Sequence, residues 1–230
     1  MANGSLYIVA TPIGNLGDMT FRAVETLKSA DGILAEDPRQ TLKLLHHYQI
    51  DKKIRPYCDH TSPVRTQQIV EELLGGASLA LVSDAGTPGI SDPGEGLVEK
   101  ALLAGVSVVP IVGASAVTTL MSVFGKPFLS YHFWGFFPQR PRVQKNMAKL
   151  FFDVPGIHVF FESPYRILKT FEKFLLPLEQ AHVVVGREMT KKFETYYRGT
   201  PHEVWEHMRK DPVKGEYCVG LCLGGRSAIP

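Results

Sequence analysis

Short apolar runs alternate with amphipathic stretches along the first half of the chain. The runs are rich in β-branched residues and have the length of strands, whereas the stretches between them carry apolar residues at helical spacing. The pattern predicts strands at residues 6–10, 32–36, 53–57, 79–83 and 106–111. It predicts helices at residues 21–30, 41–48, 65–74, 96–104 and 116–124. Strands that are apolar throughout and separated by helices indicate a mainly parallel sheet covered on both faces.

The pattern changes around Gly125, Lys126 and Pro127, after which the apolar runs become rich in aromatic residues. Strands are predicted at residues 131–135, 158–161, 183–187, 194–198 and 217–223, and helices at residues 143–152, 165–175 and 201–208. The short connection after residue 187 suggests a hairpin and therefore a mixed sheet. We expect an α/β protein with an N-terminal α/β domain over residues 1–125 and a C-terminal α/β domain over residues 126–230.

Composition narrows the class of protein without settling its function. Hydrophobic residues make up 44% and charged residues 21%, as in ordinary globular proteins, and the net charge of +2 neither demands nor excludes a nucleic-acid partner. Cys58, Cys218 and Cys222 lack metal-ligand spacing and leave an odd thiol, which favours a reduced, cytoplasmic setting. The N-terminus lacks the basic region of a secretory signal. The uncharged stretch 105–125 is interrupted by Pro110 and small polar residues, so we expect no membrane span.

Three loops rich in glycine, proline or small residues follow predicted strands, with the sequences TPIGNL at 11–16, SDAGTPGISDPG at 83–94 and GASA at 113–116. Such loops let a ligand approach the backbone, and ligands of parallel α/β sheets gather at the carboxyl ends of strands. Each loop has a structural alternative, namely a stiff turn, Asp92 capping the next helix, or close helix–sheet packing. The second loop is the most informative, because its two aspartates could accept hydrogen bonds from a ribose or an amino group. The fingerprints of dinucleotide- and phosphate-binding loops are missing from the sequence, and His202 and His207 are not spaced to share a metal.

Carboxylates next to cationic residues follow three predicted strands, at residues 36–41, 162–166 and 187–192. One such cluster is usually a structural ion pair, but three at strand ends favour a polar active-site cleft. Further basic residues concentrate at 140–149 and 209–214, the first group just after an aromatic run. Cations near aromatic rings suit contact with RNA, although a solvated helix face explains them slightly better when they are taken alone.

Taken together, these motifs closely resemble the small-subunit ribosomal RNA methyltransferases of the tetrapyrrole methylase superfamily. The matching segments follow in order over nearly the whole chain: LYIVATPIGNLGDMTFRAVETL at 6–27, AEDPRQT at 35–41, LVSDAGTPGISDPG at 81–94, VVPIVGASA at 108–116, FFESPYRI at 160–167, REMTKKFET at 187–195 and KGEY at 214–217. Pro38 stands where this group usually has threonine, and Ala114 where it usually has proline. Many members carry a further segment beyond the position of Pro230.

The resemblance implies two α/β domains of the tetrapyrrole methylase type, with a mainly parallel N-terminal sheet, a mixed C-terminal sheet and a cofactor cleft between them. It implies S-adenosylmethionine as the cofactor and a homodimer. The expected reaction requires no metal. The substrate would be a cytidine ribose of 16S ribosomal RNA in the decoding region of the 30S subunit, methylated at its 2′ oxygen. The donor pocket would be lined by Pro12, Asp84, Gly86, Thr87, Ser115, Ala116, Phe161, Met189 and Gly215.

A ribose hydroxyl is a poor nucleophile unless a base accepts its proton in the transition state. We predict that Glu162 or Glu188 accepts this proton or orients the hydroxyl. Neighbouring phosphates would be held by Arg39, Arg166 and Lys191. Two other functions stay open. One is methylation of a corrin precursor or another tetrapyrrole, against which the AEDPR and ESPYR segments argue. The other is a non-catalytic RNA-binding assembly factor that keeps the donor pocket as a relic.

Overall fold

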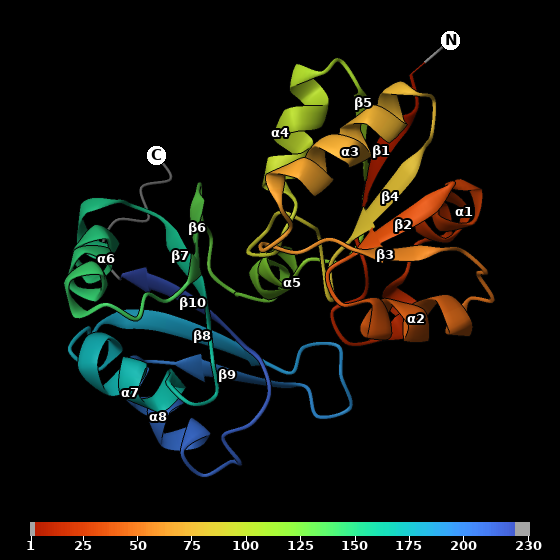
Figure 1. Ribbon diagram of the computed structural model, residues 1–230. Coiled ribbons are helices and arrows are strands. Elements are labelled where there is room, and N and C mark those ends of the chain that lie inside the picture. The colour runs from red at the N-terminus through yellow and green to blue at the C-terminus, as the bar shows by residue number, and fades with distance from the viewer. Residues whose placement is uncertain (1–2, 224–230) are drawn as a thin grey trace. The chain divides into compact units, whose positions relative to one another are not determined.

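The computed structural model describes residues 3–223, and its internal contacts divide the chain into two compact units (Figure 1). Unit 1 comprises Met1–Ser115 and unit 2 comprises Ala116–Pro230, whereas the sequence suggests a boundary at 125/126. The difference is the helix α5 (Ala116–Ser122) and the turn after it. Leu120 of α5 packs against Gly186 and Gly220 in the sheet of unit 2. Folding of each half as an independent domain stays a prediction.

Unit 1 is built on a sheet of five parallel strands with the order β3-β2-β4-β1-β5. The strands are β1 (Ser5–Val9), β2 (Gly32–Ala35), β3 (Ile54–Pro56), β4 (Leu79–Val82) and β5 (Ser107–Ile111). Every residue of β2 and β4 is buried, which explains why these strands are apolar at all positions instead of alternating. The parallel sheet predicted from the sequence is therefore confirmed.

Helices cover both faces of this sheet. They are α1 (Phe21–Ser29), α2 (Pro38–His47), α3 (Pro63–Leu74) and α4 (Glu95–Leu103), with a short 3₁₀-helix η1 (Leu16–Asp18) before α1. Leu27 and Leu45 of α1 and α2 join one buried cluster, whereas Ile69 and Leu97 of α3 and α4 join another. The sheet thus separates two apolar cores. The loops that follow the strands lie at its carboxyl edge, where the parallel strands end.

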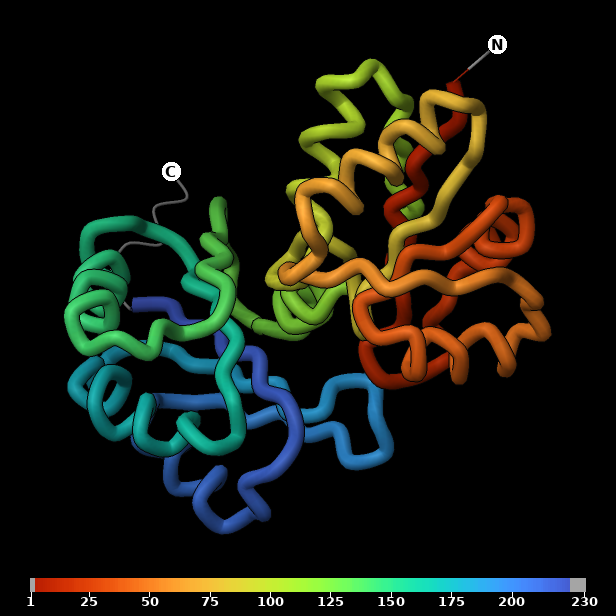
Figure 2. Tube along the Cα trace, viewed as in Figure 1, coloured from red at the N-terminus to blue at the C-terminus, as the bar shows by residue number. Residues whose placement is uncertain are grey.

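Unit 2 contains a mixed five-stranded sheet with the order β6-β7-β10-β8-β9. The strands are β6 (Tyr131–Phe136), β7 (Ile157–Glu162), β8 (Ala181–Arg187), β9 (Thr195–Gly199) and β10 (Tyr217–Leu223). β6 and β7 are parallel, and the other neighbours are antiparallel. β8 and β9 form the predicted hairpin, and Figure 2 shows its connecting loop projecting beyond the ends of the strands.

The helices of unit 2 besides α5 are α6 (Pro141–Asp153), α7 (Ile167–Thr170), a π-helical turn η2 (Phe171–Leu175) and α8 (Pro201–Met208). The helix predicted at 165–175 begins only at Ile167, because the carbonyl of Ser163 accepts the N–H groups of Arg166 and Ile167 in a turn. α8 begins with the predicted capping box of Thr200 and Glu203. Within residues 3–223, no helix has both the length and the apolar character needed to cross a membrane.

Candidate active site

The loops at the carboxyl edge of the sheet in unit 1 are tied to one another. Thr11 and Gly86 form an antiparallel bridge, in which each N–H donates to the other carbonyl at 2.8 and 3.0 Å. The Thr11 hydroxyl donates to the carbonyl of Ser83 at 3.2 Å, and the Thr87 hydroxyl donates to that of Ala114 at 3.4 Å. The loops after β1, β4 and β5 therefore form one connected platform, which we call the loop platform, at the edge where parallel α/β sheets bind ligands.

Glycine is required at two positions of the loop platform. Gly86 has φ +80°, which side chains rarely adopt, and a Cβ there would also contact Ile13. A Cβ at Gly113 would lie 2.9 Å from the Cβ of Ala10, closer than carbon atoms normally approach. The glycines that the sequence marks for close ligand approach thus also let the loops approach one another.

Asp84 cross-links the loop platform to the loop after β2. Its carboxylate Oδ1 accepts the N–H of Asp37 at 3.1 Å, while its own N–H donates to the Glu36 carboxylate at 3.2 Å. Asp84 remains exposed, and a carboxylate has about four acceptor positions on its two oxygens, so it retains capacity for a ligand. Of the predicted phosphate-binding residues, Arg39 lies nearby, pairs with Asp37 at 2.8 Å and has a side chain that is 89% exposed.

Asp92 lies near Glu36 and Asp84, and we call these three carboxylates the acidic group. The sequence offers two roles for Asp92, ligand binding in the loop or capping of the next helix. α4 instead begins after Gly94, without a side-chain cap. Burial, followed by the negative charge of Glu36, raises the pKa of Asp92 to about 7. Burial also raises the pKa values of Glu36 and Asp84. The repeated Ser-Asp in the 83–94 loop was the available signal, but only folding brings Asp92 close to Glu36 and Asp84.

Glu162 ends β7 and is held by three groups of the following turn and helix. The N–H of Ser163 donates to its carboxylate at 2.8 Å, the Thr170 hydroxyl at 2.7 Å, and Arg166 forms an ion pair at 2.5 Å. The Glu162 side chain is fully buried, and the Arg166 side chain is 27% exposed. These contacts make Glu162 an anchor between β7 and α7, and Arg166 its counter-ion.

Glu188 begins the β8–β9 loop and is more accessible than Glu162. Lys191 donates to its Oε1 at 2.9 Å and to the carboxylate of Glu216 at 2.8 Å, and the N–H of Glu216 also donates to Glu188 at 2.9 Å. Burial alone would raise the pKa of Glu188, but the hydrogen bonds from Lys191 and Glu216 outweigh it and the pKa is lowered. Glu188 is therefore ionised at neutral pH.

The backbone around Glu188 is strained. Glu188 has φ +51° and Thr190 has φ +67°, in a region that side chains other than glycine rarely adopt. Gly215, with φ +88°, lies against Glu188 so closely that a Cβ there would be 2.4 Å from the glutamate Cδ. Such strain is typical of functional sites, where the surrounding structure has to maintain it.

The remaining residues predicted to line the methyl-donor pocket lie at or just after the ends of strands. Pro12 is partly buried between the bridged Thr11 and Ile13, and Ser115 and Ala116 are partly buried at the junction of β5 and α5. In unit 2, Phe161 packs against the rings of Phe133 and Phe136, and Met189 is buried over Gly186.

The structure thus brings the predicted residues together in separate groups. In unit 1, the loop platform carries Pro12, Asp84, Gly86, Thr87 and Ser115. In unit 2, Glu188, Lys191 and Gly215 form one group. Glu162 and Arg166 form another at the same sheet edge, because β7 and β8 run in the same direction on either side of β10.

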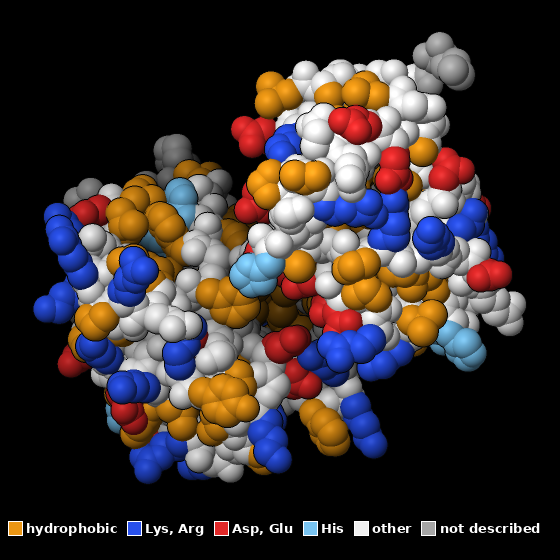
Figure 3. Space-filling model, viewed as in Figure 1, with side chains coloured by type: hydrophobic (Ala, Val, Ile, Leu, Met, Phe, Trp, Pro, Cys, Tyr) orange, Lys and Arg blue, Asp and Glu red, His pale blue; other side chains and the backbone are white. Residues whose placement is uncertain are grey.

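The basic residues of α6 remain on an exposed face. Arg142, Lys145 and Lys149 are exposed there, and Lys149 lies 3.9 Å from Asp153. Figure 3 shows lysine and arginine side chains scattered over both units on the face drawn, instead of one continuous patch. This distribution agrees with the small net charge of +2.

Comparison with known proteins defines the class to which this arrangement belongs. The family described as Tetrapyrrole (Corrin/Porphyrin) Methylases matches residues 5–204. The chain belongs to the tetrapyrrole methylase family. The chain is 44% identical over 227 residues to "Ribosomal RNA small subunit methyltransferase I" of Halalkalibacterium halodurans, covering 99% of this chain and 78% of that protein. The protein of the same name from Bacillus subtilis is 41% identical, covering 94% of this chain and 74% of that protein. The resemblance noted in the sequence is confirmed.

Solved structures share the fold at much lower identity. A diphthine synthase superposes with a TM-score of 0.72 at 14% identity and covers 95% of this chain and 90% of that chain. A cobalt precorrin-4 methyltransferase gives 0.65 at 17% identity, with 95% and 94% covered. These two likenesses confirm the predicted tetrapyrrole methylase fold.

S-adenosylmethionine is the methyl donor of this family. The loop platform fits such a group, because Asp84 is exposed there and its carboxylate retains acceptor capacity. Within the described part of the chain, no group of three or more His, Cys, Asp or Glu side chains could hold a metal ion.

Proposed function

We propose that the protein transfers a methyl group from S-adenosylmethionine to small-subunit ribosomal RNA. The observation that carries the proposal is the 41–44% identity, over nearly the whole chain, to proteins named Ribosomal RNA small subunit methyltransferase I. The bound donor supplies an electrophilic methyl group on a sulfonium. Pro12, Asp84, Gly86, Thr87, Ser115 and Ala116 hold this donor in our proposal, and contacts from Phe161, Met189 and Gly215 remain predictions.

The acceptor in this proposal is the 2′ oxygen of a cytidine ribose in the decoding region. Its hydroxyl needs a proton acceptor, and such a base typically contributes about 10²–10⁴-fold to the rate. Glu188 is the better candidate of the two glutamates, because it is ionised and partly accessible. Both oxygens of Glu162 are already occupied by Ser163, Thr170 and Arg166. Lys191, next to Glu188, would hold the phosphate beside the reacting ribose. Arg39 and Arg166 remain candidates for holding other phosphates of the RNA.

The setting of the reaction is part of the same proposal. We infer a cytoplasmic enzyme that works as a homodimer on 16S ribosomal RNA, either free or within the 30S subunit. A tetrapyrrole substrate has weaker support, because the corrin methylase likeness is at 17% identity and extends to the fold alone.

Reconstitution with purified RNA tests the proposal. The protein, S-adenosylmethionine and either 16S RNA or 30S subunits should give one ribose-methylated cytidine by mass mapping. Methyl transfer to a corrin precursor with none to RNA would support the tetrapyrrole alternative. Weak binding of S-adenosylmethionine without transfer would support the non-catalytic assembly factor.

Paired glutamate variants test the assignment of the base. Glu188→Gln should lower the single-turnover rate by about 10²-fold or more, with the fold unchanged. Glu162→Gln should lower the free energy of unfolding by about 2–4 kcal/mol, because Arg166 would lose its buried counter-ion. Full single-turnover rates in both variants would remove carboxylate base catalysis from the proposal.

A further inference from the structure

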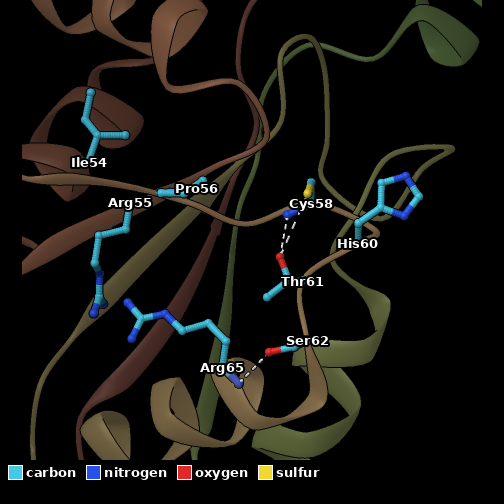
Figure 4. A pocket seen from close by; sticks show the side chains of 8 residues that line it. All are labelled: Ile54, Arg55, Pro56, Cys58, His60, Thr61, Ser62 and Arg65. Atoms are coloured by element: carbon cyan, nitrogen blue, oxygen red, sulfur yellow. Dashed lines mark hydrogen bonds between the residues drawn. The ribbon is translucent and has the colours of Figure 1, made fainter.

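We propose that a pocket in unit 1, between β3 and the start of α3, binds a backbone phosphate of the RNA substrate. The pocket has a volume of about 450 Å³ and is shown in Figure 4. Arg55 of β3 and Arg65 of α3 line it together with His60, Thr61 and Ser62. The inference rests on the proposed function and adds to it a binding position for the RNA strand.

The walls of the pocket offer hydrogen-bond donors and positive charge. Its lining includes two guanidinium groups, one imidazole and two hydroxyls, and no carboxylate. Guanidinium groups bind phosphate oxygens with two parallel hydrogen bonds, and hydroxyls add further donors. The lining therefore suits an anion with several oxygens.

The cations around the pocket, Arg55, Arg65 and Lys53, outnumber the carboxylates beside it, which are Glu72 and, in the adjoining turn, Asp59. Arg55 donates to both oxygens of Glu72, at 2.7 and 2.8 Å, whereas Arg65 donates to the neutral amide of Gln68 at 3.1 Å. The hydrogen bond from Arg55, with the charges of Arg55, Arg65 and Lys53, lowers the pKa of Glu72. Three cations thus act on one carboxylate. Figure 4 shows Arg65 extending from the first turn of α3 toward Arg55, so a phosphate there would meet both.

A hydrogen-bonded turn at residues 58–61 lies between this pocket and the acidic group. The N–H of Cys58 donates to the Thr61 hydroxyl at 2.9 Å, and the N–H of Thr61 donates to the carbonyl of Cys58 at 2.8 Å. Asp59, inside the turn, raises the pKa values of Glu36 and Asp92, so its charge acts on that acidic group. An RNA backbone would be repelled by the acidic group and attracted by the pocket.

The pocket and the loop platform lie on the same sheet but at different strands. β3 is an edge strand, and β2 lies between it and β4, whose following loop contains Asp84. Two strand spacings correspond to about 10 Å. A phosphate in the pocket would therefore bind at a point separate from the donor-binding residues of the loop platform.

Salt-dependent RNA binding by Arg65 variants of the full chain tests this inference. Arg65→Gln should weaken binding of a small-subunit RNA fragment about 3–10-fold at low salt and reduce the slope of log K against log salt by about 0.7–0.9. Arg65→Lys should keep the slope and recover only part of the affinity, because lysine lacks the planar fork. Affinity for S-adenosylmethionine and kcat at saturating RNA should not change.

The matched control removes one positive charge near the amino ends of the strands, away from the pocket. Lys28 is exposed in the last turn of α1, which leads into the amino end of β2, and Lys28→Ala should leave affinity and slope unchanged. Equal affinity and slope for Arg65→Gln and Lys28→Ala, in a protein that still methylates RNA, would overturn the inference and leave the proposed function standing. So would loss of inorganic phosphate binding in Arg65→Gln with RNA binding intact. A wild-type protein that neither binds nor methylates RNA would instead refute the proposed function.

Discussion

Asp92 illustrates at the scale of one residue how folding changes side-chain chemistry. Its burial and the nearby Glu36 and Asp84 raise its pKa to about 7, even though Ser83 offers it a hydrogen bond. The folded protein thus binds a proton at Asp92 more tightly than the unfolded chain does. Stability from this group is therefore complete below the unfolded pKa of 3.8 and is lost as pH rises toward the folded pKa of about 7.

The variant Asp92→Asn should be more stable than the wild type at neutral pH. The gain should be absent near pH 4, grow as pH rises, and level off above about pH 7, because only the wild type then carries the charge. We expect about 1–2 kcal/mol after allowing for solvent screening of a partly exposed group. Denaturant unfolding across this pH range measures it. Asp51→Asn, at an exposed carboxylate outside the acidic group, is the control, and an equal gain there would contradict the assignment.

At the level of secondary-structure elements, the β8–β9 loop and the residues just before β10 form one connected group. Gly215 leaves room for Glu188, and Lys191 bridges Glu188 and Glu216. Residues 188 and 215 are far apart in the sequence, yet β8 and β10 are paired, with Arg187 opposite Tyr217. The position of the proposed base Glu188 thus depends on Gly215, a glycine in the segment that leads into β10.

Gly215→Ala should impair methyl transfer in the manner of Glu188→Gln. Its Cβ would lie 2.4 Å from the Glu188 Cδ, so the glutamate has to move and its contact with Lys191 is disturbed. We expect a loss of about 10-fold or more in the single-turnover rate, within the range that a base contributes.

Gly105→Ala is the matched control for backbone strain. Gly105 has φ +76°, similar to the φ +88° of Gly215, but nothing lies within 4 Å of its Cβ position. Gly105→Ala should lower the free energy of unfolding as Gly215→Ala does, and should leave the single-turnover rate unchanged. Equal rates in the two variants would show that the position of Glu188 does not matter for the reaction.

S-adenosylmethionine should stabilise the whole molecule if the loop platform holds it. A ligand at about 100 times its dissociation constant adds about 2.7 kcal/mol to the stability of the folded state. Thermal unfolding with and without the donor, together with calorimetry, measures this. Asp84→Ala should reduce the shift, because the cross-link to Asp37 and the acceptor are both lost. No shift in the wild type would argue for a relic pocket.

Most elements could be predicted because their cause is local. Apolar runs such as β2 and β4 are buried on both faces, and the helix starts at Thr20, Ser62 and Thr200 carry their own capping side chains. The segment after β7 differs from the predicted helix at 165–175. The turn at Ser163 and the contacts of Glu162 with Arg166 and Thr170 determine where α7 begins.

The sequence by itself determined the alternation of strands and helices, the mixed sheet of the second half, and the family, since these depend on periodicity and on contiguous motifs. Only the tertiary structure decided the environment of each charged side chain. Glu162 and Glu188 look alike in the sequence, yet one is buried among three partners and the other lies partly accessible beside Lys191. The reason is physical: burial and charge act through space, and strand pairing brings together residues that the chain keeps far apart.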